Sequence, residues 1–162
     1  MHWMYRAIVL VLLAVAAGCG FHLRGQVPLP AVVARPYIET GDRYSPLYAA
    51  LTSQLRAAGA SLAPDAATAS AVVHLHVDST GRELLSVAAN NNRPGEYEVY
   101  YAVEYSVTAG ERELLARQQA RLTRDYSYDE AAVLAKEHEE QSLRVALADE
   151  LAGLILRRLA AL

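Results

Sequence analysis

The sequence predicts an α+β domain with a single, mostly antiparallel four-stranded sheet and two helices packed on one face, in the order β-α-β-β-β-α. Alternating apolar and polar side chains over residues 96–107 indicate a long strand with one solvated face. Leucines recur at every fourth position after Ser45-Pro46, and a second helical leucine pattern reaches about Leu159. Shorter alternating segments between these patterns supply the remaining strands.

The first strand and the first helix are predicted between residues 36 and 59. Residues 36–39 are predicted to form a short strand after an extended, proline-containing tether over residues 20–35. Ser45 is placed as the N-cap of the helix and Pro46 as its first residue. Leu47, Leu51 and Leu55 share one helical face, and Gly59 ends the helix.

Residues 71–77 alternate and therefore predict the second strand, and the same pattern extends through Leu85 and Val87. The expected inward residues are Val73, Leu75 and Val77, and the expected outward residues are His74, His76 and Asp78. A dense turn signal follows at residues 90–95.

The third strand is the clearest in the chain, with Tyr97, Val99, Tyr101, Val103, Tyr105 and Val107 on one face. A turn at Gly110 leads to a fourth strand over residues 114–124. Its expected inward residues are Leu114, Ala116, Ala120 and Leu122.

The last helix is predicted to start at a capping box, Ser127 to Glu130, with an acidic first turn. Its apolar stripe comprises Leu143, Leu147, Leu151 and Leu154. Arg157-Arg158 near its end complement the helix dipole. The polar stretch 136–141 inside this helix is expected to project beyond the sheet or to meet a polar group.

The N-terminus has the features of an export signal, since Arg6 precedes an apolar run over residues 7–17. At ~1.5 Å per residue this run is too short to span a bilayer. The sequence Ala16-Ala17-Gly18-Cys19 is similar to the lipobox of bacterial lipoproteins, which implies that Cys19 becomes the lipidated first residue. The alternative is an ordinary signal peptide that happens to end in a cysteine. No aspartate follows Cys19, which in enterobacterial lipoproteins implies export to the outer membrane.

We therefore divide the chain into a signal peptide (1–18), a lipidated tether (19–35) and one α+β domain (36–162). The formal net charge of −3 argues against nucleic acid as a partner. Ten tyrosines against one phenylalanine suit half-exposed sheet faces and interfaces. His74 and His76 could form half of a zinc site, but spacing places no third ligand, so we predict no metal and a solvent-facing pair. No catalytic motif occurs, and we expect neither an enzyme nor a cofactor beyond the lipid on Cys19.

Several segments resemble one family, the LPS-assembly lipoproteins LptE (RlpB) of Gram-negative outer membranes. They are residues 18–25 at the lipidation site, Glu96-Tyr97, and residues 134–140 in the last helix. The resemblance implies an outer-membrane lipoprotein on the periplasmic side that plugs a large LPS-translocon β-barrel of the LptD type. It further implies assistance with inserting lipopolysaccharide into the outer leaflet.

The same resemblance implies that Lys136 and Arg93 contact lipopolysaccharide, through charge-assisted hydrogen bonds to lipid A phosphates. The candidate residues for contact with the barrel are the strand tyrosines Tyr97, Tyr100, Tyr101 and Tyr105. Two other functions remain open: an auxiliary lipoprotein of a phospholipid-transport complex, and a lipid-anchored periplasmic enzyme.

Overall fold

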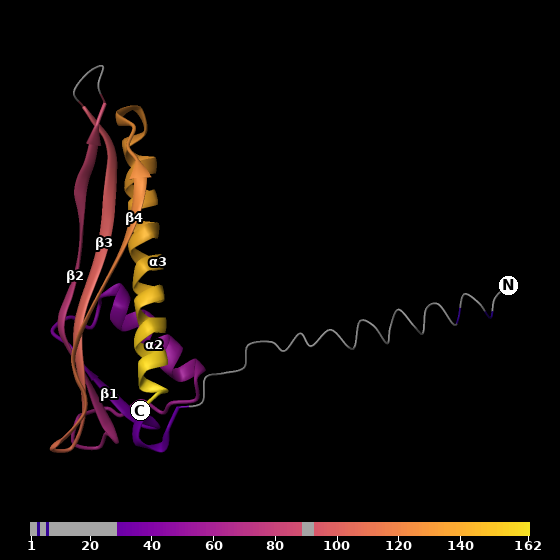
Figure 1. Cartoon of the computed structure of the whole chain (residues 1–162), viewed down its shortest axis with the longest axis vertical. Helices are drawn as coiled ribbons and strands as arrows, with labels where there is room; N and C mark the ends of the chain where they lie inside the picture. Colours follow the sequence, from indigo (N-terminus) through magenta and orange to yellow (C-terminus); the bar gives the residue numbers. More distant parts are fainter. Residues whose placement is uncertain (1–2, 4–5, 7–28, 89–92) are drawn as a thin grey trace.

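Figure 1 shows the computed structural model of the chain, which describes residues 29–88 and 93–162 together with Trp3 and Arg6. The predicted signal peptide, except for Trp3 and Arg6, lies outside the described residues, as do Cys19 and tether residues 20–28. Residues 89–92, which include the first half of the predicted turn at 90–95, also lie outside them. The elements are η1 (Ala31–Val33), β1 (Pro36–Glu39), α2 (Pro46–Ala57), β2 (Ala71–Val87), β3 (Pro94–Ala109), β4 (Arg112–Ser127), η2 (Glu130–Ala132) and α3 (Val133–Leu159).

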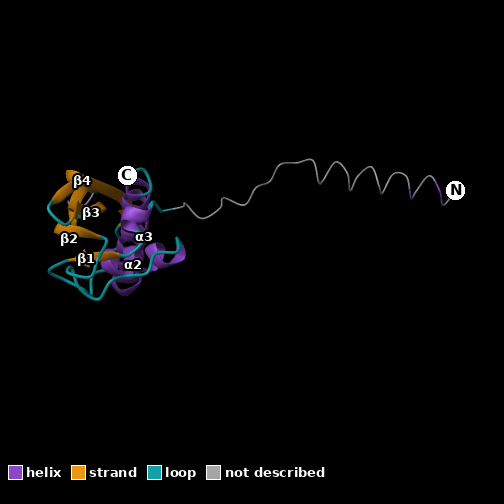
Figure 2. Ribbon diagram, turned by 90° about the horizontal axis from the view of Figure 1, so that it is seen from below, coloured by secondary structure: helices purple, strands orange, loops and turns teal. Residues whose placement is uncertain are grey.

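The four strands form one sheet in the order β1-β2-β3-β4. β1 pairs with β2 in parallel, and the other two pairs are antiparallel. Figure 2, seen along the long axis, shows both helices on the same side of the sheet, which leaves the other face without a helix. These features confirm the predicted fold class, and we call the uncovered side the open face.

Helix α2 forms as the sequence predicts. The Ser45 hydroxyl accepts a hydrogen bond from the backbone N–H of Tyr48 at 3.1 Å, and Pro46 is the first helical residue. Gly59, with φ of 89°, ends the helix in the left-handed conformation that favours glycine. The three predicted leucines, Leu47, Leu51 and Leu55, are completely buried.

Strand β2 contains an extra residue that the alternation of its side chains conceals. Leu75 lies opposite Tyr105, but Val77 lies opposite Glu104, so His76 is the extra residue of a β-bulge. Beyond it the two faces of β2 exchange, and Asp78 lies opposite the core residue Val103. The predicted orientations of Val77 and Asp78 are therefore wrong.

Downstream of the bulge, β2 continues through Val87 as its pattern suggested, but its apolar residues do not extend the core. Val77 is 40% exposed, and Leu85 and Val87 are about half exposed. In β4 the predicted inward residue Ala116 is also exposed. The strand pairing shifts register between Tyr105 and Val107, and this interrupts the alternation at that point.

Helix α3 starts later than predicted, because β4 continues to Ser127. Asp129, rather than Ser127, caps the following 3-10 turn by accepting a hydrogen bond from the Ala131 N–H at 2.9 Å. The first turn of α3 contains no acidic residue, contrary to expectation, whereas the basic residues in its last turn are confirmed. Its buried face comprises Leu147, Ala148, Leu151, Ala152, Ile155 and Leu159, while Leu154 of the predicted stripe is 36% exposed.

Candidate functional site

The domain is elongated, and its two ends are built from different elements (Figure 1). At one end lie β1, α2 and the C-terminus, with the first described residue of the tether, Leu29. We call this the near end. At the opposite end, the end of β2 and the start of β3 lie beside the end of β4 and the start of α3. We call this the far end and define it as residues 82–87, 93–99, 124–128 and 133–144.

A buried carboxylate holds α3 against the sheet at the far end. Glu140 is 8% exposed, and it accepts hydrogen bonds from Arg82 at 2.9 Å and from the Tyr126 hydroxyl at 2.8 Å. Arg144, one turn along α3, forms a further ion pair with it. The predicted polar stretch of α3 therefore meets polar partners on β2 and β4.

Burial and hydrogen bonding act on the Glu140 pKa in opposite directions. Burial alone would raise the pKa, because it penalises the charged form. The hydrogen bonds from Tyr126 and Arg82, with the positive charge of Arg144, more than offset this and lower the pKa below its ordinary value. Glu140 is therefore ionised at neutral pH. Hydrogen bonding to Tyr126 and then to Glu140 raises the pKa of Arg82, while burial, assisted by the hydrogen bond to Glu140, raises the pKa of Tyr126.

Three tyrosines pack beside this ion-paired cluster. The ring of Tyr97 stacks on that of Tyr126 with centroids 6.0 Å apart, and it meets the ring of Tyr128 edge-on at 5.3 Å. The Arg82 guanidinium lies over Tyr97, 4.7 Å from its centroid. The Tyr128 N–H donates to the Gly95 carbonyl at 2.9 Å, so the end of β4 is tied to the start of β3.

The structure places both predicted lipopolysaccharide contacts at the far end. Arg93 is an exposed residue immediately before β3, and Lys136 lies in the first turn of α3. The Lys136 ammonium pairs with Glu139 at 2.8 Å, and its side chain is 17% exposed. Apolar side chains are also exposed there, with Leu84 at 53% and Leu134 at 74%.

The four tyrosines predicted to face a barrel lie in three environments, of which the first is the far-end cluster where Tyr97 packs against Tyr126 and Tyr128. Tyr101 and Tyr105 are 1% and 5% exposed and belong to the hydrophobic core. Burial raises the pKa of both hydroxyls, and a hydrogen bond to the Asp78 carboxylate at 2.6 Å raises that of Tyr101 further. A residue buried in the domain offers no surface to a partner, so these two are corrected to core residues.

Tyr100 lies on the open face, where it belongs to an ion-paired surface. The Arg121 guanidinium lies 4.2 Å from the centroid of the Tyr100 ring and pairs with Glu83 at 2.9 Å. A second pair joins Arg117 and Glu104 at 2.7 Å. The Tyr100 ring also lies over Gly81, where a Cβ would come within 2.7 Å of the phenolic oxygen. Glycine at this position makes room for the tyrosine.

The predicted histidine pair does lie together near the bulge. The rings of His74 and His76 are nearly parallel with centroids 6.0 Å apart. His74 contacts Glu39 and Thr108, while His76 contacts Ser106. Within residues 29–88 and 93–162, no group of three or more possible ligands is arranged to hold a metal ion.

Sequence patterns did not single out Arg82, Glu140 or Arg121, which organise these two surfaces. The bulge at His76 brings Arg82 to the helix side, and alternation alone predicts no bulge. A single acidic residue in a helix with many acidic residues also gives no signal of burial. The polar stretch inside an otherwise apolar helical pattern was the only pointer to Glu140.

A comparison with known families identifies the chain. The profile of the family described as LptE, lipopolysaccharide-assembly, matches residues 34–159, which cover nearly the whole described domain. The chain belongs to the LptE family. A similar relative is the LPS-assembly lipoprotein LptE of Pectobacterium atrosepticum, 26% identical over 160 residues, which covers 98% of this chain and 85% of the relative.

Solved structures agree with this membership of the LptE family. A lipoprotein B from Nitrosomonas europaea superposes with a TM-score of 0.71 at 28% identity, covering 88% of this chain and 91% of that one. The rare lipoprotein B from Shewanella oneidensis gives 0.68 at 28% identity, covering 78% and 94%. The LptE-family chain thus has an LPS-assembly lipoprotein role. Among its described residues, no helix combines the length and apolar character needed to cross a membrane.

Proposed function

We propose that this protein is a lipoprotein of the outer membrane, anchored on the periplasmic side through acyl chains on Cys19. In this proposal it plugs the β-barrel of an LptD-type translocon and assists the insertion of lipopolysaccharide into the outer leaflet. The observation that carries the proposal is the family match over residues 34–159. Two acyl chains give stable anchoring where one chain is marginal, which suits a partner held at the membrane.

The chemistry of the open face supports the role of a plug. The interior of a large outer-membrane barrel is polar, so a domain inserted there needs a polar surface. The open face presents the Arg121–Glu83 and Arg117–Glu104 pairs, with Tyr100 on β3 beneath the Arg121 guanidinium. Tyrosine combines ring contact with a hydrogen-bonding hydroxyl, as protein interfaces favour.

The far end supports direct contact with lipopolysaccharide. Lys136 and Arg93 would pair with phosphate groups, because hydrogen bonds between charged groups are stronger than those between neutral groups. Exposed Leu134 and Leu84 add apolar surface at the same end. In the proposed complex, the Lys136 ammonium exchanges its exposed partner Glu139 for a phosphate. The pair is exposed on the side of Glu139, so breaking it for this exchange costs little free energy.

A pair of charge reversals on one strand tests the barrel-facing surface. Arg121 faces the open side, whereas Arg124, three residues further along β4, faces α3 and pairs with Glu150 at 3.0 Å. Arg121→Glu places a third acid beside Glu83 and Glu98 on the proposed contact surface. We expect the tagged Arg121→Glu protein to recover much less barrel on co-purification than the wild type. Arg124→Glu, with the same change of charge, is expected to recover a normal amount.

The proposal would be contradicted if both variants recovered the barrel normally, or if the wild-type protein recovered none. Equal losses in both variants would also count against the open face, because Arg124 does not lie on it. The amount of folded protein, measured by circular dichroism before each experiment, separates an interface effect from unfolding.

A further inference from the structure

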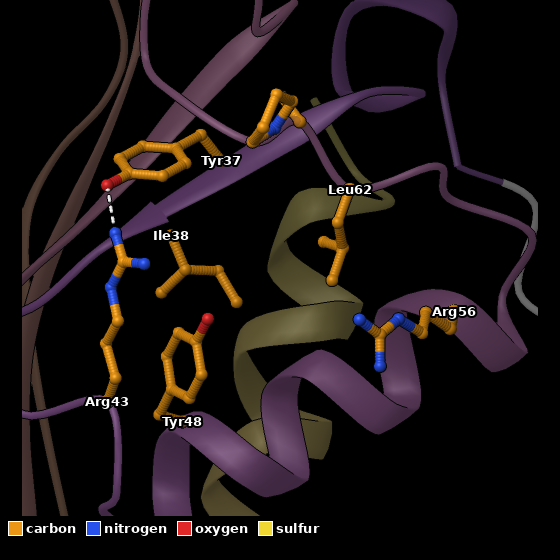
Figure 3. Close-up of a pocket in the computed structure, with 8 residues that line it drawn as sticks. Tyr37, Ile38, Arg43, Tyr48, Arg56 and Leu62 are labelled. Atoms are coloured by element: carbon orange, nitrogen blue, oxygen red, sulfur yellow. Dashed lines mark hydrogen bonds between the residues drawn. The ribbon is translucent and has the colours of Figure 1, made fainter.

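A groove at the near end has no role in the proposal above. It lies between the edge strand β1, helix α2 and the loop over residues 62–64, and it encloses about 270 Å³ (Figure 3). Tyr37 and Ile38 line it from β1, Tyr48 and Arg56 from α2, and Arg43 from the loop between them. The loop is held in place because the Ala63 N–H donates to the Pro36 carbonyl at 2.9 Å.

The charged groups of this groove are all positive. Among its described lining residues there is no acid, and its only charged side chains are Arg43 and Arg56. Arg117, Arg121 and Arg124 each pair with a carboxylate, whereas neither arginine of this groove pairs with one that the structure describes.

The two guanidinium groups differ in how they are held. Arg43 donates to the Tyr37 hydroxyl at 2.6 Å and lies 5.7 Å from the centroid of that ring, so it is positioned without being neutralised. The Arg56 guanidinium makes no hydrogen bond or ion pair with any residue that the structure describes. Both therefore have donors free for a ligand, and the Tyr37 hydroxyl, already accepting, can donate.

The floor of the groove is apolar. Ile38 is 4% exposed, and Leu62 packs against the core from the loop side. Figure 3 shows the Tyr48 hydroxyl pointing into the space beside Ile38, with Arg43 and Arg56 on opposite sides of the groove. A guanidinium fork at each side of an apolar floor suits an anion with a short apolar neighbour, because the fork matches phosphate oxygens and the apolar part can lie on Ile38 and Leu62.

We propose that this groove binds the phosphate ester of a headgroup, with Arg43 and Arg56 as the anion ligands. The position of the groove bears on where the phosphate comes from. Only residues 20–28 separate Cys19 from the described domain, and an extended chain of that length spans roughly 30 Å. If Cys19 carries the anchor proposed above, the groove lies within reach of lipid headgroups. Phosphate binding itself does not depend on the anchor.

The test uses the purified full-length mature protein in a non-ionic detergent, titrated by calorimetry with two probes. One probe is inorganic phosphate, and the other is a short-chain phosphatidylglycerol below its micellar concentration. Arg43→Gln combined with Arg56→Gln removes both proposed ligands. Arg157→Gln combined with Arg158→Gln removes the same charge from the end of α3, where two exposed arginines also line a groove without an acid among its described lining residues, and serves as the matched control.

We expect the wild-type protein to bind at least one probe. The groove variant should bind about tenfold more weakly or worse, and the control within about twofold of the wild type. Tighter binding of the lipid would identify a lipid headgroup as the source, and equal binding would identify the phosphate alone. Absence of wild-type binding, or equal losses in both variants, would overturn the proposal. Barrel co-purification reports separately on the plug role, because the groove lies on β1 and α2, away from Tyr100 and Arg121.

Discussion

The two ends of this domain are stabilised by different kinds of contact. At the near end, α2 and the second half of α3 pack leucine and isoleucine side chains against the sheet, and these side chains are completely buried. At the far end only α3 covers the sheet, and it is held there by Glu140 with two arginines and by stacked tyrosines. The near end therefore supplies most of the stability of the fold, while the far end combines order with polar groups suited to a ligand.

The largest expected effect is at the near end. Leu151→Ala removes a completely buried side chain from the core and leaves a cavity. We expect a loss of about 2–5 kcal/mol in the free energy of unfolding, measured by urea denaturation. Leu154→Ala on the same helix is the control, because Leu154 is 36% exposed, and it should cost much less. Equal losses would show that burial does not distinguish the two positions.

A smaller and local effect is expected for Glu140→Gln at the far end. The substitution leaves Arg82 and Arg144 without a counterion and should cost about 1–3 kcal/mol. We expect hydrogen-exchange protection to fall in residues 94–99 and 124–128, and to stay unchanged in α2. Glu150→Gln breaks the exposed pair with Arg124 and is the control. A uniform loss of protection over the whole domain would contradict the division into two ends.

The pH dependence of hydrogen-exchange protection should also differ between the two ends of the domain. The folded-state pKa of Glu140 lies below its ordinary value of 4.5, so the ionised form is favoured by folding. This contribution is fully present above that value and is lost as the pH falls through the folded-state pKa. Protection at the far end should therefore decline in acid before protection at the near end does. In Glu140→Gln this early decline should be absent.

The smallest effect on stability is expected for Lys136→Gln, and it separates stability from ligand contact. The pair with Glu139 is exposed on the acid's side, so its loss should change the free energy of unfolding by less than about 0.5 kcal/mol. Lipopolysaccharide binding, in contrast, should weaken several-fold if the ammonium meets phosphate. Glu139→Gln breaks the same ion pair but keeps the ammonium, so it should leave binding unchanged or stronger. Identical effects of the two variants on binding would exclude the proposed role of Lys136.

Local patterns were sufficient to predict most of the fold. Ser45 and Pro46 start α2 because capping and proline preferences depend only on neighbouring backbone groups. The alternation of β3 predicted its buried face correctly because the extra residue of the bulge belongs to β2, so the side chains of β3 keep their period of two from Val99 to Tyr105. The start of α3 was misjudged because β4 pairs with β3 as far as Ser127, and this long-range pairing overrides a local capping signal.

The candidate surfaces were less accessible to prediction. The alternation of β3 places Tyr101 on the core-facing side, yet Tyr101 is also a candidate for contact with a barrel. Its burial in the core and the hydrogen bond from its hydroxyl to Asp78 decide between the two. The cluster around Glu140 could not be predicted without knowing that Arg82 points toward α3, and the orientation of Arg82 depends on the bulge at His76. The family resemblance supplied Lys136 and Arg93, which no residue pattern in the chain distinguishes from other surface cations.

The bulge at His76 decides which side chains of β2 face the helices. Strand side chains alternate with period two, so pairing this same sequence without a bulge would turn Asp78 and Arg82 outward and bring their neighbours inward. Glu140 and Tyr101 would then lose Arg82 and Asp78 as partners. Deletion of His76 itself would instead close the bulge and leave both residues facing the helices. Natural variation in this family should therefore tolerate loss of His76 more readily than loss of Ser79, because closing the bulge after loss of Ser79 would turn Asp78 outward.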